Sequence, residues 1–263
     1  MPSASTPPAP SPAQGPPAQT PRGRLSRRGF LGALAALAVS AGAFAWGLVP
    51  ARARSAFEER FPTRTVEKPE FRFDPARGEI LWQDGRRERY ALTLDGLVKA
   101  PVLLAYSDLR ALPQVRRTAD FHCVEGWSVT DAPWGGVEFR DLFARVSLLP
   151  TAKHAVFHSL GRTENAGGLT HYVESLPLAD LLNPALGAML ALDMEGQPLP
   201  DRRGAPARVV CPFDLAYKSI KFVHRVEFTE AAVPGWWTRA NPIYPVHAPV
   251  QKNRLRTPDP RRG

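Results

Sequence analysis

Between residues 79 and 230 the chain consists of short apolar runs separated by turn signals, and this pattern restricts the possible folds more than any other feature. Two runs of helical spacing stand out, residues 107–112, which Pro113 stops, and residues 139–146. No segment repeats, and no glycine-rich phosphate loop is present. The predicted strands are residues 80–82, 90–94, 115–122, 154–159, 189–194, 208–211 and 222–228. We therefore predict an α+β domain dominated by strands, with Asp84-Gly85 as a hairpin turn between the first two.

Composition divides the chain into a leader, a core domain and a tail. Residues 1–21 contain eight prolines, so this stretch cannot bury a core. The polar residues 55–78, with scattered aromatics, predict a connector, and the proline-rich end predicts an extended tail packed on the domain. The predicted parts are a disordered leader (1–25), a signal or anchor (26–54), the connector (55–78), the catalytic domain (79–230) and the tail (231–263).

The segment after the leader predicts the compartment. Arg27 and Arg28 are followed by Phe30, Leu31 and a mild apolar run that is rich in alanine and glycine. This arrangement resembles a twin-arginine export signal. The alternative is a plain membrane anchor, because residues 30–50 approach the roughly 20 residues that span a bilayer. Both alternatives predict that residues 55–263 lie in the periplasm or at the outer face of the cytoplasmic membrane.

The positive charge is concentrated at the two ends of the chain. The net charge is +9, but residues 1–54 carry six arginines and no acidic residue. The last 13 residues add five basic groups and Asp259, which leaves 23 basic and 24 acidic residues in between. A nucleic-acid-binding protein needs its basic groups on a folded face. We therefore expect no nucleic-acid partner.

Two cysteines, Cys123 and Cys211, are too few for a disulfide scaffold. They are either bonded to one another, or at least one thiol is kept for chemistry. Cys123 lies in a loop-like segment with Trp127, Trp134 and several glycines, which is typical of a pocket for a bulky ligand. The residues alone also allow a buried structural cysteine beside core aromatics.

A second block combines basic residues with a strand that ends at a proline. Arg208 lies on the strand, and Lys218 and Lys221 follow it. Three cationic side chains converging on one place suit a phosphate, which offers several charged acceptor oxygens. A solvated basic strand is the alternative reading of the same residues.

Taken together, the two blocks resemble a known family. Cys-Val-Glu-x-Trp-Ser at residues 123–128 and Pro-Trp-x-Gly-Val at residues 133–137 are similar to the molybdenum-ligand loop of the sulfite oxidase superfamily. Within that superfamily, the chain most resembles the branch containing the catalytic subunit of periplasmic methionine-sulfoxide reductase. The resemblance runs from about residue 90 to residue 228. It implies a sulfite-oxidase-like molybdopterin-binding fold.

The resemblance also implies functional residues. Cys123 corresponds to the metal ligand, and Arg203 stands where the family has an asparagine. In the methionine-sulfoxide reductase branch, another asparagine and a Tyr-Glu pair contact the cofactor, and residues 55–78 show no convincing match to them. The cofactor-binding residues that it implies are His122, Cys123, Ser159, Arg203, Arg208, Tyr217, Lys218, Ser219, Ile220 and Lys221.

The activity that the resemblance implies is molybdopterin-dependent oxidoreduction of a small molecule. Residues 124–127 lack the arginines that sulfite oxidases carry after the ligand cysteine, and about 35 residues follow Phe228, too few for an immunoglobulin-like domain. Both features favour a monomeric, reductase-type catalytic subunit that acts on a sulfoxide-like substrate and receives electrons from a membrane haem protein. The alternatives are sulfite oxidation and a metal-free envelope binding module of the same fold.

Overall fold

The computed structural model describes residues 65–262. These residues belong to one compact unit. The predicted leader (1–25), the signal or anchor (26–54) and the first ten residues of the predicted connector lie outside the described residues.

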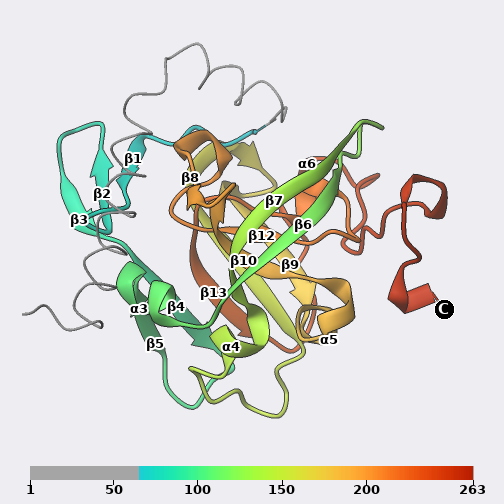
Figure 1. Cartoon of the computed structure of the whole chain (residues 1–263), viewed down its shortest axis with the longest axis horizontal. Helices are drawn as coiled ribbons and strands as arrows, with labels where there is room; N and C mark the ends of the chain where they lie inside the picture. The colour runs from blue at the N-terminus through green and yellow to red at the C-terminus, as the bar shows by residue number, and fades with distance from the viewer. Residues whose placement is uncertain (1–64, 263) are drawn as a thin grey trace, which may run out of the picture. The chain divides into compact units, whose positions relative to one another are not determined.

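The described residues form three sheets (Figure 1). All neighbouring strands are antiparallel except β13 and β4. The first sheet has the order β1-β2-β3, with β1 (Phe71–Asp74), β2 (Glu79–Trp82) and β3 (Arg87–Arg89). The second sheet has the order β11-β10-β7-β6, and β12 also pairs with β10. Its strands are β6 (Gln114–His122), β7 (Ser128–Glu138), β10 (Met189–Met194), β11 (Gln197–Pro198) and β12 (Arg208–Val210). The third has the order β5-β4-β13-β8-β9, with β4 (Ala91–Gly96), β5 (Val102–Ala105), β8 (His154–Ala166), β9 (Leu169–Pro177) and β13 (Val223–Thr229).

Helices in the described part of the chain are short. Single 3₁₀ turns occur at Pro184–Leu186, Asp201–Arg203, Ala216–Lys218, Lys252–Arg254 and Pro260–Arg262. The α-helices are α3 (Tyr106–Ala111), α4 (Phe139–Phe143), α5 (Leu178–Leu181) and α6 (Trp236–Ala240). Among residues 65–262, no helix has the length and apolar character needed to cross a membrane. The predicted class, α+β with strands dominating, is confirmed.

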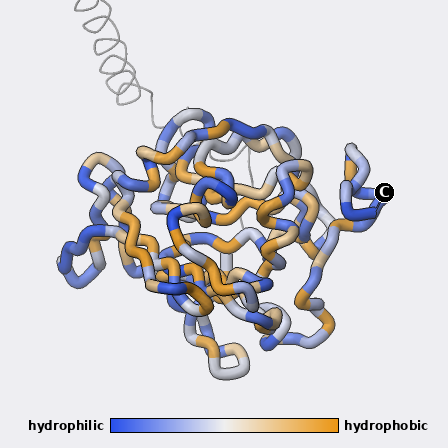
Figure 2. Tube along the Cα trace, turned by 90° about the horizontal axis from the view of Figure 1, so that it is seen from below, coloured by the Kyte–Doolittle hydropathy of each residue, from blue (hydrophilic) through white to orange (hydrophobic). Residues whose placement is uncertain are grey.

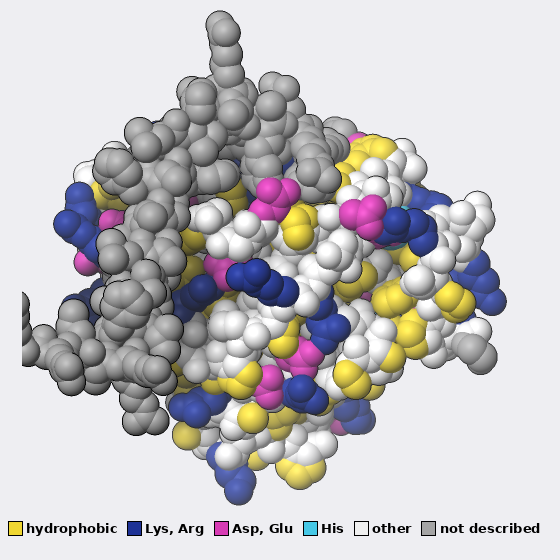
Figure 3. Space-filling view, viewed as in Figure 1, with side chains coloured by type: hydrophobic (Ala, Val, Ile, Leu, Met, Phe, Trp, Pro, Cys, Tyr) yellow, Lys and Arg dark blue, Asp and Glu magenta, His cyan; other side chains and the backbone are white. Residues whose placement is uncertain are grey.

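The core lies between the sheets, where apolar stretches of the trace gather (Figure 2). Strand β10 is apolar almost throughout because it is covered on both faces. Gly136 on β7 lets the two strands approach: a Cβ atom there would lie 2.1 Å from the carbonyl oxygen of Leu190. On the face shown in Figure 3, basic and acidic side chains alternate, so the described residues form no continuous basic stripe there.

The predicted pairing of the first two strands was wrong, and two other segments differ in detail from the prediction. Asp84-Gly85 does form a turn, but β2 pairs with β3, whereas Ala91–Gly96 joins the third sheet. The reason is burial: Leu92 and Leu94 are fully buried in the core, while every residue of β3 is exposed and therefore shows no apolar period. Helix α3 begins one residue before Ser107, and the Asp108 carboxylate accepts the Ala105 N–H. The tail contains a helical turn, α6, where an extended chain was predicted.

Candidate functional site

The β6–β7 hairpin ends in a tight loop that carries Cys123 (Figure 1). The backbone N–H of Cys123 donates to the carbonyl of Trp127 at 2.9 Å, and that of Gly126 donates to the carbonyl of Cys123 at 3.1 Å. Gly126 has a φ of +96°, a conformation that favours glycine. Gly126, which occupies the x position of the Cys-Val-Glu-x-Trp-Ser motif, thus suits the turn that orients the cysteine.

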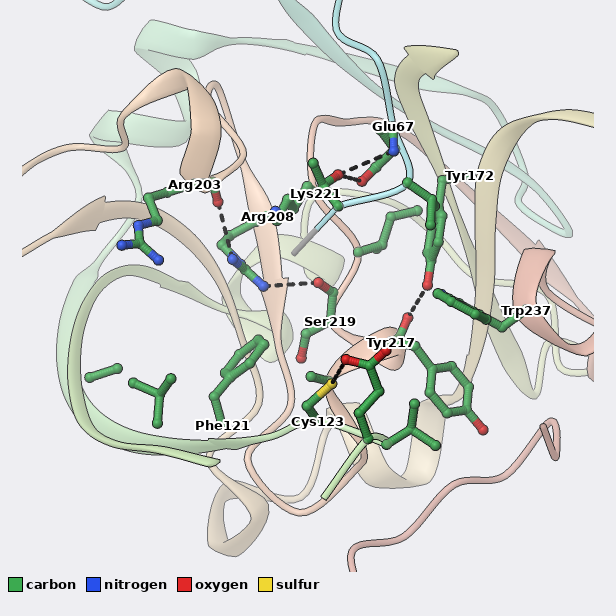
Figure 4. A pocket seen from close by; sticks show the side chains of 18 of the residues that line it. Glu67, Phe121, Cys123, Tyr172, Arg203, Arg208, Tyr217, Ser219, Lys221 and Trp237 are labelled. Carbon is green, nitrogen blue, oxygen red and sulfur yellow. Dashed lines mark hydrogen bonds between the residues drawn. The ribbon is translucent and has the colours of Figure 1, made fainter. Parts of the chain in front are cut away.

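The loop borders a cavity with an empty volume of about 930 Å³, its open mouth included (Figure 4). Segments far apart in the sequence contribute to its wall: the connector, the β6–β7 hairpin, β9, the segment around β12 and the tail. A wall that combines a thiol, cationic side chains and aromatic rings suits a bulky ligand rather than a single ion. The lining residues are Thr65, Val66, Glu67, Phe121, Cys123, Val124, Glu125, Trp127, Val129, Ala132, Trp134, Tyr172, Met194, Arg203, Arg208, Ala216, Tyr217, Ser219, Ile220, Lys221 and Trp237.

One end of the cavity carries the thiol. The Sγ atom of Cys123 lies 3.9 Å from the Oε2 atom of Glu125, which also accepts the indole N–H of Trp127 at 3.3 Å. Cys123 is half-buried and Glu125 is exposed. Cys211 is buried outside this wall, and the two cysteines are not bonded to one another. Cys123 therefore lines the cavity and takes no part in a disulfide with Cys211.

Arg208 fixes the middle of the wall. Its guanidinium carbon lies 4.8 Å from the ring centre of Phe121 and 4.9 Å from that of Trp134. The same group donates to the carbonyls of Arg203 at 3.1 Å and Ser219 at 3.0 Å. Burial lowers the pKa of Arg208 to about 10, which leaves it charged at neutral pH. Arg208 thus joins the two cavity-lining segments and keeps a positive charge between the two aromatic rings.

The other end of the cavity is cationic around one buried carboxylate (Figure 4). Glu67 is 7% exposed and accepts the hydroxyls of Thr65 at 2.7 Å and Ser159 at 3.0 Å. Burial raises its pKa, and the Thr65 hydrogen bond and Lys221 oppose that rise. Burial and the nearby charge of Arg208 lower the pKa of Lys221 to about 7. A phosphate here would face more cationic groups than the single carboxylate can neutralise.

We expect the stability of the cofactor-free chain to depend on the titration of Lys221. Its folded pKa of about 7 lies below its ordinary value of 10.5, so the unfolded chain binds more protons between these values. The free energy of unfolding should therefore rise with pH across this window and fall as the pH drops through about 7. Urea unfolding at about pH 7 and about pH 10 should show this rise in the wild type and a smaller one in Lys221→Met. Parallel pH curves for the two proteins would contradict this expectation.

Most of the predicted binding residues line this cavity. These are Cys123, Arg203, Arg208, Tyr217, Ser219, Ile220 and Lys221. His122, Ser159 and Lys218 do not line it. The His122 ring lies 2.8 Å from the Ser128 hydroxyl, and burial lowers its pKa. Ser159 lies behind Glu67, whose carboxylate it orients. Lys218 forms a buried ion pair with Glu174 at 2.5 Å.

Glu67, Tyr172 and Trp237 also line the cavity, and none of them was predicted from the sequence. Glu67 follows Val66 in the connector, and no tyrosine stands before it to indicate a Tyr-Glu pair. The Tyr172 hydroxyl donates to the carbonyl of Tyr217 at 2.7 Å. For Trp237, the sequence offered one signal, which is that it stands next to Trp236 in the tail.

The residues present fit molybdopterin. The cavity offers the Cys123 thiol to a metal, and it offers the cationic side chains of Arg203, Arg208 and Lys221 to an anion. Aromatic side chains form part of the wall as well. The hydroxyl of Ser219 accepts the backbone N–H of Cys211, so its proton can be donated to a ligand. A phosphorylated, metal-carrying pterin requires this combination of donors.

Comparison with known proteins agrees with this arrangement. The chain is 34% identical over 162 residues to the protein-methionine-sulfoxide reductase catalytic subunit MsrP of Gluconobacter oxydans, across 58% of this chain and 51% of that protein. It is 32% identical over 247 residues to MsrP of Ralstonia nicotianae, across 84% of this chain and 72% of that protein. It is 34% identical over 151 residues to the uncharacterized oxidoreductase YuiH of Bacillus subtilis, across 57% of this chain and 71% of that protein.

The chain spans about half the length of the first of these relatives. The family model described as the oxidoreductase molybdopterin binding domain matches residues 80–237, more than half of the chain. These findings confirm the predicted superfamily, the enzyme class and the cofactor. The chain therefore belongs to the oxidoreductase molybdopterin binding domain family.

Proposed function

We propose that this protein reduces a small sulfoxide-like substrate by oxygen-atom transfer, with Cys123 as the protein ligand of the molybdenum. The observation that carries the proposal is the cavity itself, in which the Cys123 thiol and the cationic group of Arg203, Arg208 and Lys221 face one space. Identity of 32–34% to catalytic subunits of protein-methionine-sulfoxide reductases supports the choice of substrate class.

A sulfoxide, two electrons and two protons give a thioether and water, so the S–O bond breaks and the sulfur is reduced. When bound, the molybdenum cofactor accepts the oxygen atom and supplies the electron pair. The chain's own residues hold the cofactor: Cys123 anchors the metal, while Arg208 and Lys221 neutralise the phosphate. Glu67 limits the repulsion among the cations before the cofactor arrives.

The surroundings of Cys123 favour an uncharged substrate over an anionic one. The Glu125 carboxylate, two residues after the proposed ligand, lies 3.9 Å from the Cys123 sulfur, where an anion-binding site would need cations. Val124, Trp127 and Trp237 add an apolar wall. A sulfite anion would approach this carboxylate against charge repulsion, whereas a sulfoxide would not. We therefore assign sulfoxide reduction rather than sulfite oxidation.

We further propose that the protein is exported by the twin-arginine-type segment and works as a monomeric catalytic subunit. The electrons would come from a haem-containing membrane protein, because the motifs of this chain account for molybdopterin only. Residues 30–50 would either be removed on export or keep the subunit at the outer face of the cytoplasmic membrane.

Metal analysis joined to a substrate panel tests the proposal. Full-length protein from a host that makes the cofactor should contain about one molybdenum per chain, as expected for one cavity holding one cofactor. With a reduced dye as electron donor, sulfoxides should be turned over and sulfite should not be oxidised. Protein without molybdenum would mean a binding module, and preferred oxidation of sulfite would reverse the proposed direction.

A further inference from the structure

The C-terminal segment 248–256 braces the loop that carries Cys123, although the match to the family model ends at residue 237. Arg254 donates from one guanidinium nitrogen to the carbonyl of Trp127 at 2.9 Å and to the hydroxyl of Ser128 at 3.2 Å. The Trp127 carbonyl also accepts the backbone N–H of Cys123 at 2.9 Å. A carbonyl oxygen has two lone pairs, and here one is used by the cysteine and the other by Arg254.

Apolar packing joins the same segment to the loop. Val124, the residue after Cys123, packs against a buried cluster that includes Ala248 and Val250, and Leu255 packs on that cluster as well. Leu215 and Tyr217 complete the cluster, and Tyr217 also lines the cavity. The loop is therefore held by the hydrogen bonds of Arg254 and by apolar packing on a cluster to which the C-terminal segment contributes Ala248 and Val250.

The segment is itself fixed on both sides of Arg254. Before it, the backbone N–H of Leu215 donates to the carbonyl of Ala248 at 2.7 Å, and that of Val250 donates to the carbonyl of Phe213 at 3.0 Å. After it, Arg256 bridges Asp120 at 2.5 Å and Asp131 at 2.7 Å, which lie on the two strands of the hairpin. Arg254 therefore acts from an anchored backbone rather than from a loose end.

We propose that Arg254 is a positioning residue for the metal ligand: through the Trp127 carbonyl it holds the Cys123 loop in the orientation that presents the thiol to the cavity. The inference rests on the proposed function, since it assumes that Cys123 binds the metal. It adds that the C-terminal segment supports a site most of whose lining residues lie within the family domain.

The first test measures the thiol in full-length protein from a host that cannot make the cofactor. Iodoacetamide labelling at Cys123, mapped by mass spectrometry with buried Cys211 as internal reference, should be about tenfold faster in Arg254→Ala. The reason is that this variant loses the charge-assisted hydrogen bonds that restrain the loop. Arg254→Lys, which keeps a donor, should restore much of the slow rate. Arg262→Ala is the matched control, since Arg262 is paired with Asp259 in the same tail.

The second readout is the electron paramagnetic resonance spectrum of the partly reduced, cofactor-loaded protein. Arg254→Ala should change the molybdenum signal at unchanged molybdenum content and melting temperature, and Arg254→Lys should return it toward the wild type. Equal labelling rates in wild type and Arg254→Ala, equal acceleration by Arg262→Ala, or an unchanged spectrum would each overturn the inference. Wild-type protein without molybdenum would instead refute the proposed function. The labelling rates are measured without cofactor and so test the role of Arg254 separately.

Discussion

Replacing Cys123 by alanine is expected to abolish activity while the protein stays folded and keeps much of its pterin. Cys123 is half-buried at the end of the hairpin, and its backbone hydrogen bonds with Trp127 and Gly126 do not need the side chain. Groups that merely orient a metal ligand contribute about 10–100-fold to metal affinity or activity, so losing the ligand itself should cost more. Sulfoxide turnover with a dye donor, measured beside the melting temperature, checks both parts.

Cys211→Ala is the matched control for the thiol. Cys211 is 5% exposed and its pKa is raised by burial, so it is an inert core residue. Its replacement should reduce stability and leave turnover per molybdenum intact. Activity in Cys123→Ala, or an equal loss in Cys211→Ala, would remove the special role of Cys123.

Replacing Lys218 by methionine should destabilise the protein by about 3–5 kcal/mol, because the charge of Glu174 would stay buried without its partner. The two side chains are 1% and 0% exposed and lie 2.5 Å apart. The matched control is Lys153→Met, because Lys153 and Glu230 are both 65% exposed; its effect should stay within about 1 kcal/mol. Denaturant unfolding of the full-length chain measures both. A loss for Lys218→Met no larger than the control's would contradict the buried pair.

The pH dependence distinguishes the ion pair from a packing effect. Burial raises the pKa of Glu174 from 4.5 to about 6, and Lys218 opposes that rise. A carboxyl with a raised folded pKa contributes stability that is present at low pH and lost as pH rises through that value. Without Lys218 the pKa of Glu174 should rise further, so Lys218→Met should be most destabilised above about pH 6. The double variant Glu174→Gln/Lys218→Met should lose most of this pH dependence.

Lys218 also illustrates where the sequence misleads. A lysine three residues before Lys221 was expected to bind phosphate, but the 3₁₀ turn at Ala216–Lys218 directs it toward Glu174 on β9. Nothing in the local sequence indicates that pairing, because the two residues are 44 positions apart. The neighbouring Ser219, Ile220 and Lys221 do line the cavity, since they follow the turn.

The strand-dominated fold could be predicted because apolar runs such as residues 189–194 coincide with the strands that fill the core. Pairing could not be predicted, since Ala91–Gly96 meets β13 from 130 residues further along the chain. The loop of Cys123 was recognisable from its glycine and tryptophans. Its brace was not, because the contacts of Arg254 with Trp127 and Ser128 depend on where the tail runs.

X-ray absorption at the molybdenum edge tests the central claim most directly, because it counts the sulfur atoms bound to the metal. Cys123→Ala loaded with cofactor should show one sulfur neighbour fewer than the wild-type protein, at comparable molybdenum content. An identical sulfur count in the two proteins would mean that the Cys123 thiolate does not bind the molybdenum.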